Sequence, residues 1–156
     1  MKKKSTPGAA PLAPSLQQLL ADSYLLYLKT QNFHWNVEDP RFSSLHKLFE
    51  EQYEELAEAV DLIAERLRGL GVKAPASMRQ FLALSTLREA EGEYSGDEML
   101  RQLAEDHAAI AAGLPASIEQ ATRAHDEGTG DLFIERLRVH QKTAWMLRSH
   151  FPNATK

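Results

Sequence analysis

Two histidines on either side of a short turn are the residues of this chain best suited to chemistry. The stretch 32-NFHWNVEDPRFSSLH-46 places His34 at the end of one apolar-patterned segment and His46 at the start of the next, with Asp39-Pro40 between them. One histidine near a helix end is ordinary. Two that flank a single turn can act as a pair of metal ligands, because neutral imidazole binds iron, zinc and related ions.

The segment after His46 is unusually acidic. Between Leu48 and Glu65 it has no Lys or Arg and seven acids, namely Glu50, Glu51, Glu54, Glu55, Glu58, Asp61 and Glu65. Like charges four residues apart on a helix cost roughly 0.2–0.5 kcal/mol per pair, and bound cations would relieve that repulsion. At about 100° per residue, His46, Glu50, Glu54, Asp61 and Glu65 share about one third of the helix circumference. Such a mixed ligand set suits iron, manganese or zinc, and Fe(II) where the metal meets an oxidant; an acidic solvated face with incidental histidines is the alternative.

The spacing of these residues limits how they can meet. His46 and Asp61 are 15 residues apart, which is about 22 Å along a straight helix. If His34, His46, Asp61 and Glu65 serve one site, the carboxylates must come from a second copy of the chain, paired antiparallel about a two-fold axis. Di-iron bundles with a site inside one subunit carry Glu-x-x-His motifs. None of the six histidines here has Glu three residues before it, so no such internal site is expected.

The elements that position these residues are predicted to be helices. Apolar spacing and capping signals predict long helices over residues 15–37, from 43 to about 70, from 95 to the turn at 125–128, and from a cap at Thr129 to about 151. A short helix is expected over 77–85, Pro115 is expected to kink the third long helix, and we assign Pro115 no function. Nothing is typical of a strand. The predicted fold is therefore an all-α four-helix bundle with a longish middle crossover.

Composition sets the remaining bounds. A chain of 156 residues, 43% hydrophobic and 26% charged, is expected to form one globular domain. The absence of cysteine excludes disulfides, thiolate metal sites and cysteine nucleophiles. No apolar run approaches the roughly 20 residues of a membrane span, and no signal peptide is evident. A cytoplasmic location is the default expectation.

The N-terminal residues differ from the rest of the chain. Residues 1–14, MKKKSTPGAAPLAP, are predicted to be a flexible arm, and residues 15–156 to form the bundle domain. The net charge is −4, but without Lys2, Lys3 and Lys4 the remainder has 15 basic and 22 acidic residues, or −7. The arm is thus basic and the body acidic.

With these residues in view, the chain resembles the Dps family, the mini-ferritins named for DNA protection during starvation. The resemblance covers roughly residues 15–151. It rests on His34-Trp35-Asn36-Val37, Phe42, His46, Phe49, Tyr53, the run 61-DLIAERLRGLG-71 and Trp145-Met146-Leu147. The spacing His-x11-His-x14-Asp-x3-Glu matches the family's ferroxidase signature at every ligand.

The resemblance implies a hollow shell of twelve subunits with the ferritin-like fold. Such a shell oxidises Fe(II), preferentially with hydrogen peroxide rather than oxygen, and stores Fe(III) mineral. By carry-over, His34 and His46 of one subunit and Asp61 and Glu65 of its two-fold mate form the metal site. Trp35 could trap stray oxidising equivalents, although packing is the simpler role.

Two further acidic sets follow from the resemblance. Glu50, Glu51 and Glu54 could face the cavity and nucleate mineral. The turn residues His125, Asp126, Glu127 and Asp131 fall where the family has three-fold entry pores, and an acidic ring there would concentrate Fe(II); helix capping by an exposed turn is the alternative. We interpret His107, His140 and His150 as packing or surface residues.

Three functions of different classes remain open. The favoured one is an iron-oxidising storage enzyme, a ferroxidase. The second is a non-catalytic DNA-compacting nucleoid protein, in which Lys2, Lys3 and Lys4 bind phosphates and twelve arms act together; a merely solubilising tail is the alternative, and the first two functions can coexist. The third is a metal-free structural bundle, which the four-ligand set disfavours.

Overall fold

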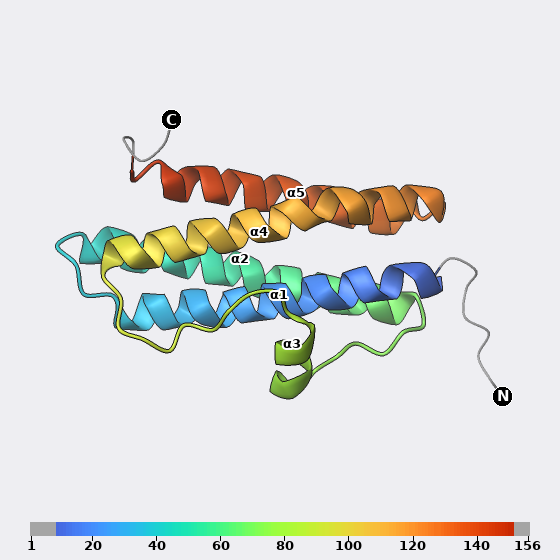
Figure 1. Cartoon of the computed structure of the whole chain (residues 1–156), viewed down its shortest axis with the longest axis horizontal. Helices are drawn as coiled ribbons and strands as arrows, with labels where there is room; N and C mark the ends of the chain where they lie inside the picture. The colour runs from blue at the N-terminus through green and yellow to red at the C-terminus, as the bar shows by residue number, and fades with distance from the viewer. Residues whose placement is uncertain (1–8, 152–156) are drawn as a thin grey trace.

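The computed structural model describes residues 9–151, and every regular element in that range is a helix. The helices are α1 (Ala9–Asn36), α2 (Phe42–Gly69), α3 (Met78–Leu84), α4 (Gly96–Arg123) and α5 (Glu127–Arg148). Four long helices lie side by side, and the short α3 sits outside them in the crossover between α2 and α4 (Figure 1). The predicted all-α bundle with an extra helix in its middle crossover is confirmed.

The four long helices pack as two antiparallel pairs. α1 packs mainly along α2 and α4 mainly along α5, and α1 also contacts both α4 and α3. The apolar side chains that repeat at steps of three and four on each helix meet in one core, whose largest fully buried members include Phe33, Phe49 and Phe133. Short turns join the partners of each pair, which is why His34 near the end of α1 and His46 near the start of α2 become neighbours.

α1 begins earlier than the sequence predicted. We expected its start at Ser15, but residues 9–14 of the predicted arm are helical. Leu12 and Ala13 are buried in the core, so tertiary packing outweighs the local signal of the prolines. Pro11 falls in the first turn, where backbone N–H groups have no partner in the helix anyway, and Pro14 removes one helical hydrogen bond. Residues 1–8 lie outside the described residues, and an arm there stays a prediction.

Side chains and glycine set the boundaries of the other helices. Ser95 and Glu98 form the predicted capping box, in which each side chain binds the other residue's backbone N–H at the start of α4. At the end of α2, Gly71 adopts φ +80°, and the Val72 N–H donates to the Leu67 carbonyl oxygen at 3.0 Å. This is a Schellman motif, and it explains why a glycine follows that helix.

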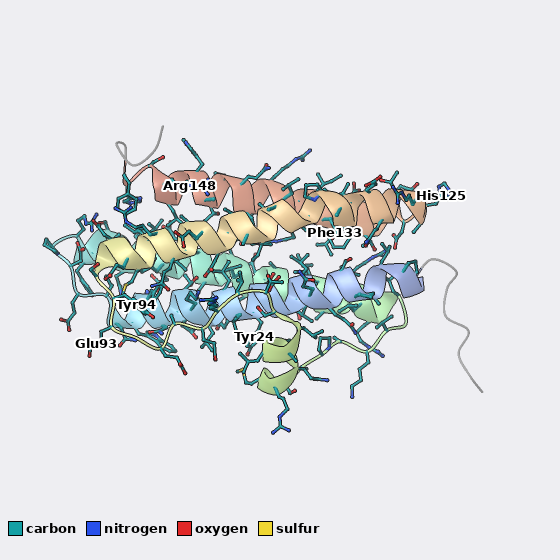
Figure 2. The ribbon with its side chains drawn as sticks, in the orientation of Figure 1. Tyr24, Glu93, Tyr94, His125, Phe133 and Arg148 are labelled. Carbon is teal, nitrogen blue, oxygen red and sulfur yellow. The ribbon has the colours of Figure 1, made fainter. Side chains whose placement is uncertain are left out.

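The start of α5 differs from the prediction by three residues. We expected Thr129 to cap it, but Asp126 is the cap and its carboxylate accepts a hydrogen bond from the Thr129 N–H at 3.0 Å. His125 just before it has φ 52°, the left-handed conformation that reverses the chain between α4 and α5. This turn forms one end of the molecule (Figure 2).

Buried polar contacts hold the crossover to the bundle. The Asp22 carboxylate on α1 accepts hydrogen bonds from the Ser85 hydroxyl at 2.7 Å and the Thr86 N–H at 2.6 Å. Tyr24, which is labelled in Figure 2, stacks on Phe81 of α3 with ring centroids 4.4 Å apart. The crossover therefore has a fixed path beside α1.

Two other expectations concern helix continuity and length. α4 runs without interruption through Pro115, and a kink at that residue stays a prediction. Over the described part of the chain, each helix is either too short or too polar to cross a lipid bilayer.

Candidate metal centre

His34 and His46 lie against each other at one end of the α1–α2 pair. Their imidazole rings stack with centroids 3.7 Å apart and an interplanar angle of 19°. The Nδ1 atom of His34 is 2.8 Å from the backbone oxygen of His46, and Nδ1 of His46 is 2.8 Å from the backbone oxygen of His34. The pair predicted from the turn is therefore one reciprocal unit.

These two hydrogen bonds fix the proton on each ring. A carbonyl oxygen can only accept, so each Nδ1 must carry the hydrogen, and each Nε2 keeps a lone pair. Both rings form these hydrogen bonds through Nδ1, and no described residue forms one with either Nε2 atom. Histidine ligands in metal sites are commonly oriented in this way by a backbone carbonyl behind them. The arrangement is that of a prepared two-nitrogen site.

Aromatic side chains enclose the pair on both sides. Phe42 stacks on His46 with centroids 5.0 Å apart, and the rings of Tyr53 and His34 form a T-shaped pair with centroids 5.2 Å apart. Desolvation raises the pKa of Tyr53, and the nearby Glu50 and Glu54 carboxylates raise it further, so its hydroxyl stays protonated. His34 itself is only 7% exposed, which holds its ring in place.

The two candidate carboxylates are on the same helix as His46 but do not join it. Asp61 and Glu65 are exposed on α2, and the 15 residues from His46 to Asp61 correspond to about 22 Å of continuous helix. Within residues 9–151, no three His, Asp or Glu side chains are grouped closely enough to hold one metal ion. One chain thus offers two nitrogens at one end of α2 and two carboxylates toward the other.

Large apolar side chains are exposed around these four residues. Trp35, next to His34, is 63% exposed, and Phe42 and Leu62 are also exposed. Leu62 lies on α2 between Asp61 and Glu65. Exposed apolar groups of this size are typical of a surface that another protein covers.

The three acids proposed for mineral nucleation differ in exposure. Glu51 and Glu54 are exposed, and Glu50 is half-buried. Glu51 lies 3.8 Å from the Lys47 ammonium, four residues earlier on α2. Such an exposed ion pair contributes little to stability and leaves the carboxylate available.

The predicted pore residues gather at the turn between α4 and α5. His125, Asp126, Glu127 and Asp131 line one hollow of about 280 Å³. Asp126 also has a structural role, because it caps α5 and pairs with the Arg66 guanidinium at 2.6 Å. Although burial acts to raise it, hydrogen bonds from Thr129 and the charge of Arg66 lower the pKa of Asp126 overall. For Asp126 the capping role is thus observed; a pore role for the set stays a prediction.

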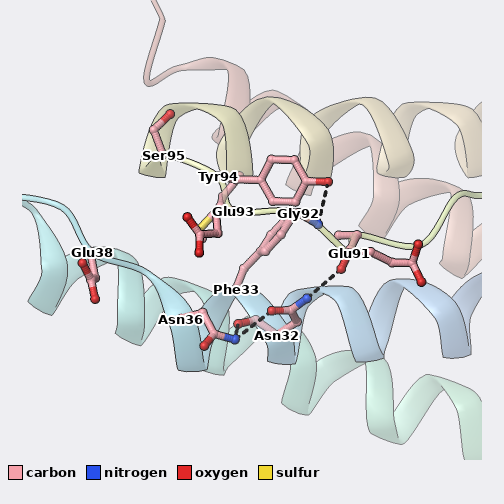
Figure 3. A pocket seen from close by; sticks show the side chains of 11 residues that line it. Asn32, Phe33, Asn36, Glu38, Glu91, Gly92, Glu93, Tyr94 and Ser95 are labelled. Atoms are coloured by element: carbon pink, nitrogen blue, oxygen red, sulfur yellow. Dashed lines mark hydrogen bonds between the residues drawn. The ribbon is translucent and has the colours of Figure 1, made fainter.

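A second hollow lies near the C-terminal end of α1. It has a volume of about 680 Å³, and its lining includes Asn32, Asn36, Glu38, Glu91 and Glu93 (Figure 3). The Asn32 amide donates to the Ala90 carbonyl oxygen at 3.0 Å and so attaches the crossover to α1. Neither His34 nor His46 lines this hollow.

Sequence reasoning missed a polar cluster in the bundle interior. His107 of α4 and His140 of α5 are both buried and in hydrogen-bond contact, and Arg136 pairs with Glu55 of α2. The only sequence signal was the pair of histidines at apolar positions, which we interpreted as packing or surface residues. Burial confirms the packing interpretation for these two, while His150 is exposed.

Comparison with known proteins places this geometry in a family. The ferritin-like domain family matches residues 14–156. The chain is 42% identical over 149 residues to an uncharacterized low temperature-induced protein of Nostoc sp., covering 90% of this chain and 83% of that protein. It is 37% identical over 134 residues to the DNA protection during starvation protein 2 of Bacillus anthracis, covering 86% and 92% of the two chains.

Solved structures of Dps proteins have the same fold as this chain. A Dps protein from Bacillus brevis superimposes with a TM-score of 0.90 at 32% identity, covering 94% of this chain and 99% of that one. The Dps protein of Vibrio cholerae, described as a member of a broad superfamily of ferritin-like diiron-carboxylate proteins, superimposes with a TM-score of 0.87 at 29% identity, covering 91% and 89%.

Proposed function

Because the chain belongs to the Dps family of ferritin-like proteins, we propose that it is a ferroxidase that binds Fe(II) at a site shared by two subunits, oxidises it and stores the Fe(III) product as mineral. The observation that carries the proposal is the reciprocal His34–His46 pair, whose two Nε2 atoms are left free by hydrogen bonds behind each ring. Two neutral imidazoles bind Fe(II) but do not complete its ligand set.

The missing ligands come from the partner subunit in this proposal. An antiparallel pairing of two α2 helices about a two-fold axis brings Asp61 and Glu65 of each chain to the histidines of the other. Each dimer then has two identical sites with two nitrogens and two carboxylates. Carboxylates also stabilise the Fe(III) product, because hard oxygen ligands favour the higher charge.

The oxidant we favour is hydrogen peroxide, which two Fe(II) ions reduce to water by supplying one electron each. Consuming both electrons at one place avoids the release of hydroxyl radical. His34 and His46 hold iron, while Asp61 and Glu65 hold iron and compensate its charge. The indole of Trp35 lies at the edge of the site, where it could intercept stray oxidising equivalents.

We further propose that the subunits close into a hollow shell of twelve. Among the residues that the structure describes, seven large apolar side chains are exposed, namely Trp35, Phe42, Leu62, Met78, Leu82, Trp145 and Met146. They occur on α1, α2, α3 and α5, so subunit contacts on more than one side would bury them. Glu50, Glu51 and Glu54 would nucleate mineral in the cavity, and His125, Asp126, Glu127 and Asp131 would surround the entry pore.

DNA binding is a separable part of the proposal. The relatives named for DNA protection and the lysines Lys2, Lys3 and Lys4 support it. Twelve basic arms on one shell would bind phosphates with high avidity even though each arm is weak. The alternative function, a non-catalytic DNA-compacting protein, would use the same arms and leave the His34–His46 pair without a role.

The shared site can be tested by mixing two inactive variants. One variant carries His34→Ala and His46→Ala, and the other Asp61→Ala and Glu65→Ala. Each alone should lose fast peroxide-driven oxidation of Fe(II), because every site lacks half its ligands. In an equal mixture, about half of the dimers are mixed, and each has one complete site and one with no ligands. About a quarter of the wild-type number of sites should therefore reappear.

Two controls accompany the mixing experiment. A tag on one variant shows that mixed oligomers form. Glu58→Ala, an exposed acid on the same helix, should keep wild-type activity and so excludes a general effect of lost charge. If mixed oligomers form and stay inactive, the shared site is wrong; if either double variant alone keeps wild-type oxidation, the ligand assignment is wrong.

A further inference from the structure

The polar cluster in the bundle interior has no part in the iron site. Nδ1 of His107 on α4 lies 2.8 Å from Nδ1 of His140 on α5, and these residues are 1% and 0% exposed. One guanidinium nitrogen of Arg136 lies 3.4 Å from Nε2 of His140, and the same guanidinium pairs with Glu55 of α2. The cluster thus links three helices of the bundle.

The hydrogen bonds assign every proton in this chain of contacts. Arginine can only donate, so Nε2 of His140 accepts and its hydrogen is on Nδ1. That hydrogen is donated to Nδ1 of His107, whose own hydrogen must therefore be on Nε2. Nε2 of His107 is buried without a hydrogen-bond partner, as is Nε of Arg136. Both imidazoles are neutral in this arrangement.

The surroundings do not tolerate a positive imidazole. Burial, followed by the charge of Arg136, lowers the pKa of His107 to about 3, and burial with the charges of His107 and Arg136 lowers the pKa of His140. The Glu55 carboxylate from α2 is already paired with Arg136. Asp106, which precedes His107 on α4, is paired with the ammonium of Lys29 on α1 at 2.6 Å. No carboxylate among these neighbours is left to compensate a new charge.

We propose that the His107–His140 pair is an acid-sensitive latch, which holds α4 to α5 at neutral pH and releases them as the pH falls. Two nitrogens in this series of hydrogen bonds can take up a proton, because they are the acceptors: Nε2 of His140 and Nδ1 of His107. A proton on Nε2 of His140 faces the donor of Arg136, and a proton on Nδ1 of His107 faces the hydrogen on Nδ1 of His140. Either protonation replaces an attractive contact with a repulsive one.

The direction of the pH dependence follows from linkage. A histidine in the unfolded chain has a pKa of about 6.5, so the open form binds protons that the closed form excludes. Stability from the latch is therefore complete above about pH 6.5 and is lost progressively toward pH 3, where His107 would also protonate in the folded state. At pH 5 the opening constant should exceed its neutral value roughly thirtyfold from His107 alone.

Hydrogen exchange of the full-length assembled protein tests the latch. Amide exchange in the peptides around His107 and His140 would be measured at pH 7.5 and pH 5.0 and corrected for the intrinsic rate at each pH. We expect the protection of these peptides to fall at least tenfold between the two conditions. Unchanged protection in the wild-type protein would overturn the proposal, whatever any variant does.

A conservative variant distinguishes release of the latch from a general loosening of the fold at acidic pH. In His107→Asn, the side-chain oxygen can still accept from Nδ1 of His140, while the titrating imidazole is removed. Its acid-induced loss of protection should be several-fold smaller than in the wild type. The matched control His150→Asn removes an exposed histidine and should behave as the wild type. Equal acid sensitivity in His107→Asn and wild type would contradict the latch.

Discussion

His34 has two roles at the scale of a single residue, since it is both a buried packing residue and a proposed ligand. Its ring stacks on His46 and its Nδ1–H satisfies a backbone carbonyl. Asp61 has no such structural role, because it is exposed on α2 and its carboxylate makes no hydrogen bond or ion pair with any described residue. The histidine and the carboxylate of the proposed site therefore differ in what they contribute to the stability of the fold.

This difference predicts a separation between stability and activity. His34→Ala should lower the free energy of unfolding by about 1–3 kcal/mol, because it leaves a cavity and removes the hydrogen bond from the imidazole to the His46 carbonyl. Asp61→Asn should change the free energy of unfolding by no more than about 0.5 kcal/mol. Both should abolish fast oxidation of Fe(II). Urea unfolding and iron oxidation followed by absorbance measure the two effects, and equal stability losses would contradict the assigned roles.

The sequence is more informative about the candidate ligands than about the buried cluster. His34, His46, Asp61 and Glu65 can be selected as candidates from the sequence because ligand type and spacing are recorded along one chain segment. The contact between His107 and His140 depends on the rotation of α4 relative to α5, which helical periodicity does not specify. Likewise, only the fold shows that Glu55 pairs with Arg136 and so cannot join the other acids of α2 as a free carboxylate.

At the scale of the element, α2 is the helix on which the site depends. It carries His46, Asp61 and Glu65 on one uninterrupted rod of 28 residues, and its end is fixed by the glycine after it. The two glycines near that end have different requirements. Gly69 is in the helix with open space around it, whereas Gly71 has φ +80°.

Alanine substitutions should therefore act in opposite directions at these two positions. Gly71→Ala should destabilise the protein by roughly 1–2 kcal/mol, because a Cβ is disfavoured in the left-handed conformation. Gly69→Ala should be neutral or stabilise by up to about 1 kcal/mol, since alanine is the better helix former and meets no neighbouring atom. Paired denaturation curves of the two variants measure this. A destabilised Gly69→Ala with an unaffected Gly71→Ala would contradict the helix end described above.

Helix existence was predictable here, and helix boundaries were less so. Ser95 with Glu98 marked the start of α4 correctly because the capping box is a local signal. The sequence favours Thr129 as the cap of α5 because threonine is a good cap residue, but Asp126 supplies the carboxylate and Thr129 the N–H. The sequence also predicts too late a start for α1, because the burial of Leu12 depends on neighbours distant in sequence.

At the scale of the whole molecule, the proposed shell makes a prediction about mass. Twelve chains of 17.5 kDa give about 210 kDa, the closed assembly expected from symmetric two-fold and three-fold contacts. Light scattering coupled to size-exclusion chromatography measures it. A stable monomer or an assembly of twenty-four chains would contradict the proposed shell. Leu62→Glu, which puts a charge on the apolar surface between Asp61 and Glu65, should reduce the mass.

The arm makes an independent prediction. Removing residues 1–8 should abolish DNA binding and leave iron oxidation unchanged, because α1 begins at Ala9 and the iron site lies at its other end. Binding by the intact protein should weaken steeply with salt, because phosphate contacts release counterions. Gel shifts at several salt concentrations test this. A full-length variant with Lys2, Lys3 and Lys4 changed together to Gln is the matched control, because it keeps the length of the arm and removes its charge. Absence of any shift at low salt would exclude DNA binding.

In the proposed arrangement, the length of α2 between His46 and Asp61 would also determine when iron oxidation can begin. A newly synthesised single chain carries both the histidines and the carboxylates of the proposed site, but α2 holds them too far apart to bind one metal centre. In the proposed arrangement such a chain cannot start iron oxidation in the open, where reactive products would escape. If only the dimer can oxidise Fe(II), specific activity should fall with dilution as subunits separate. The length of α2 would then delay the reaction until two subunits have paired.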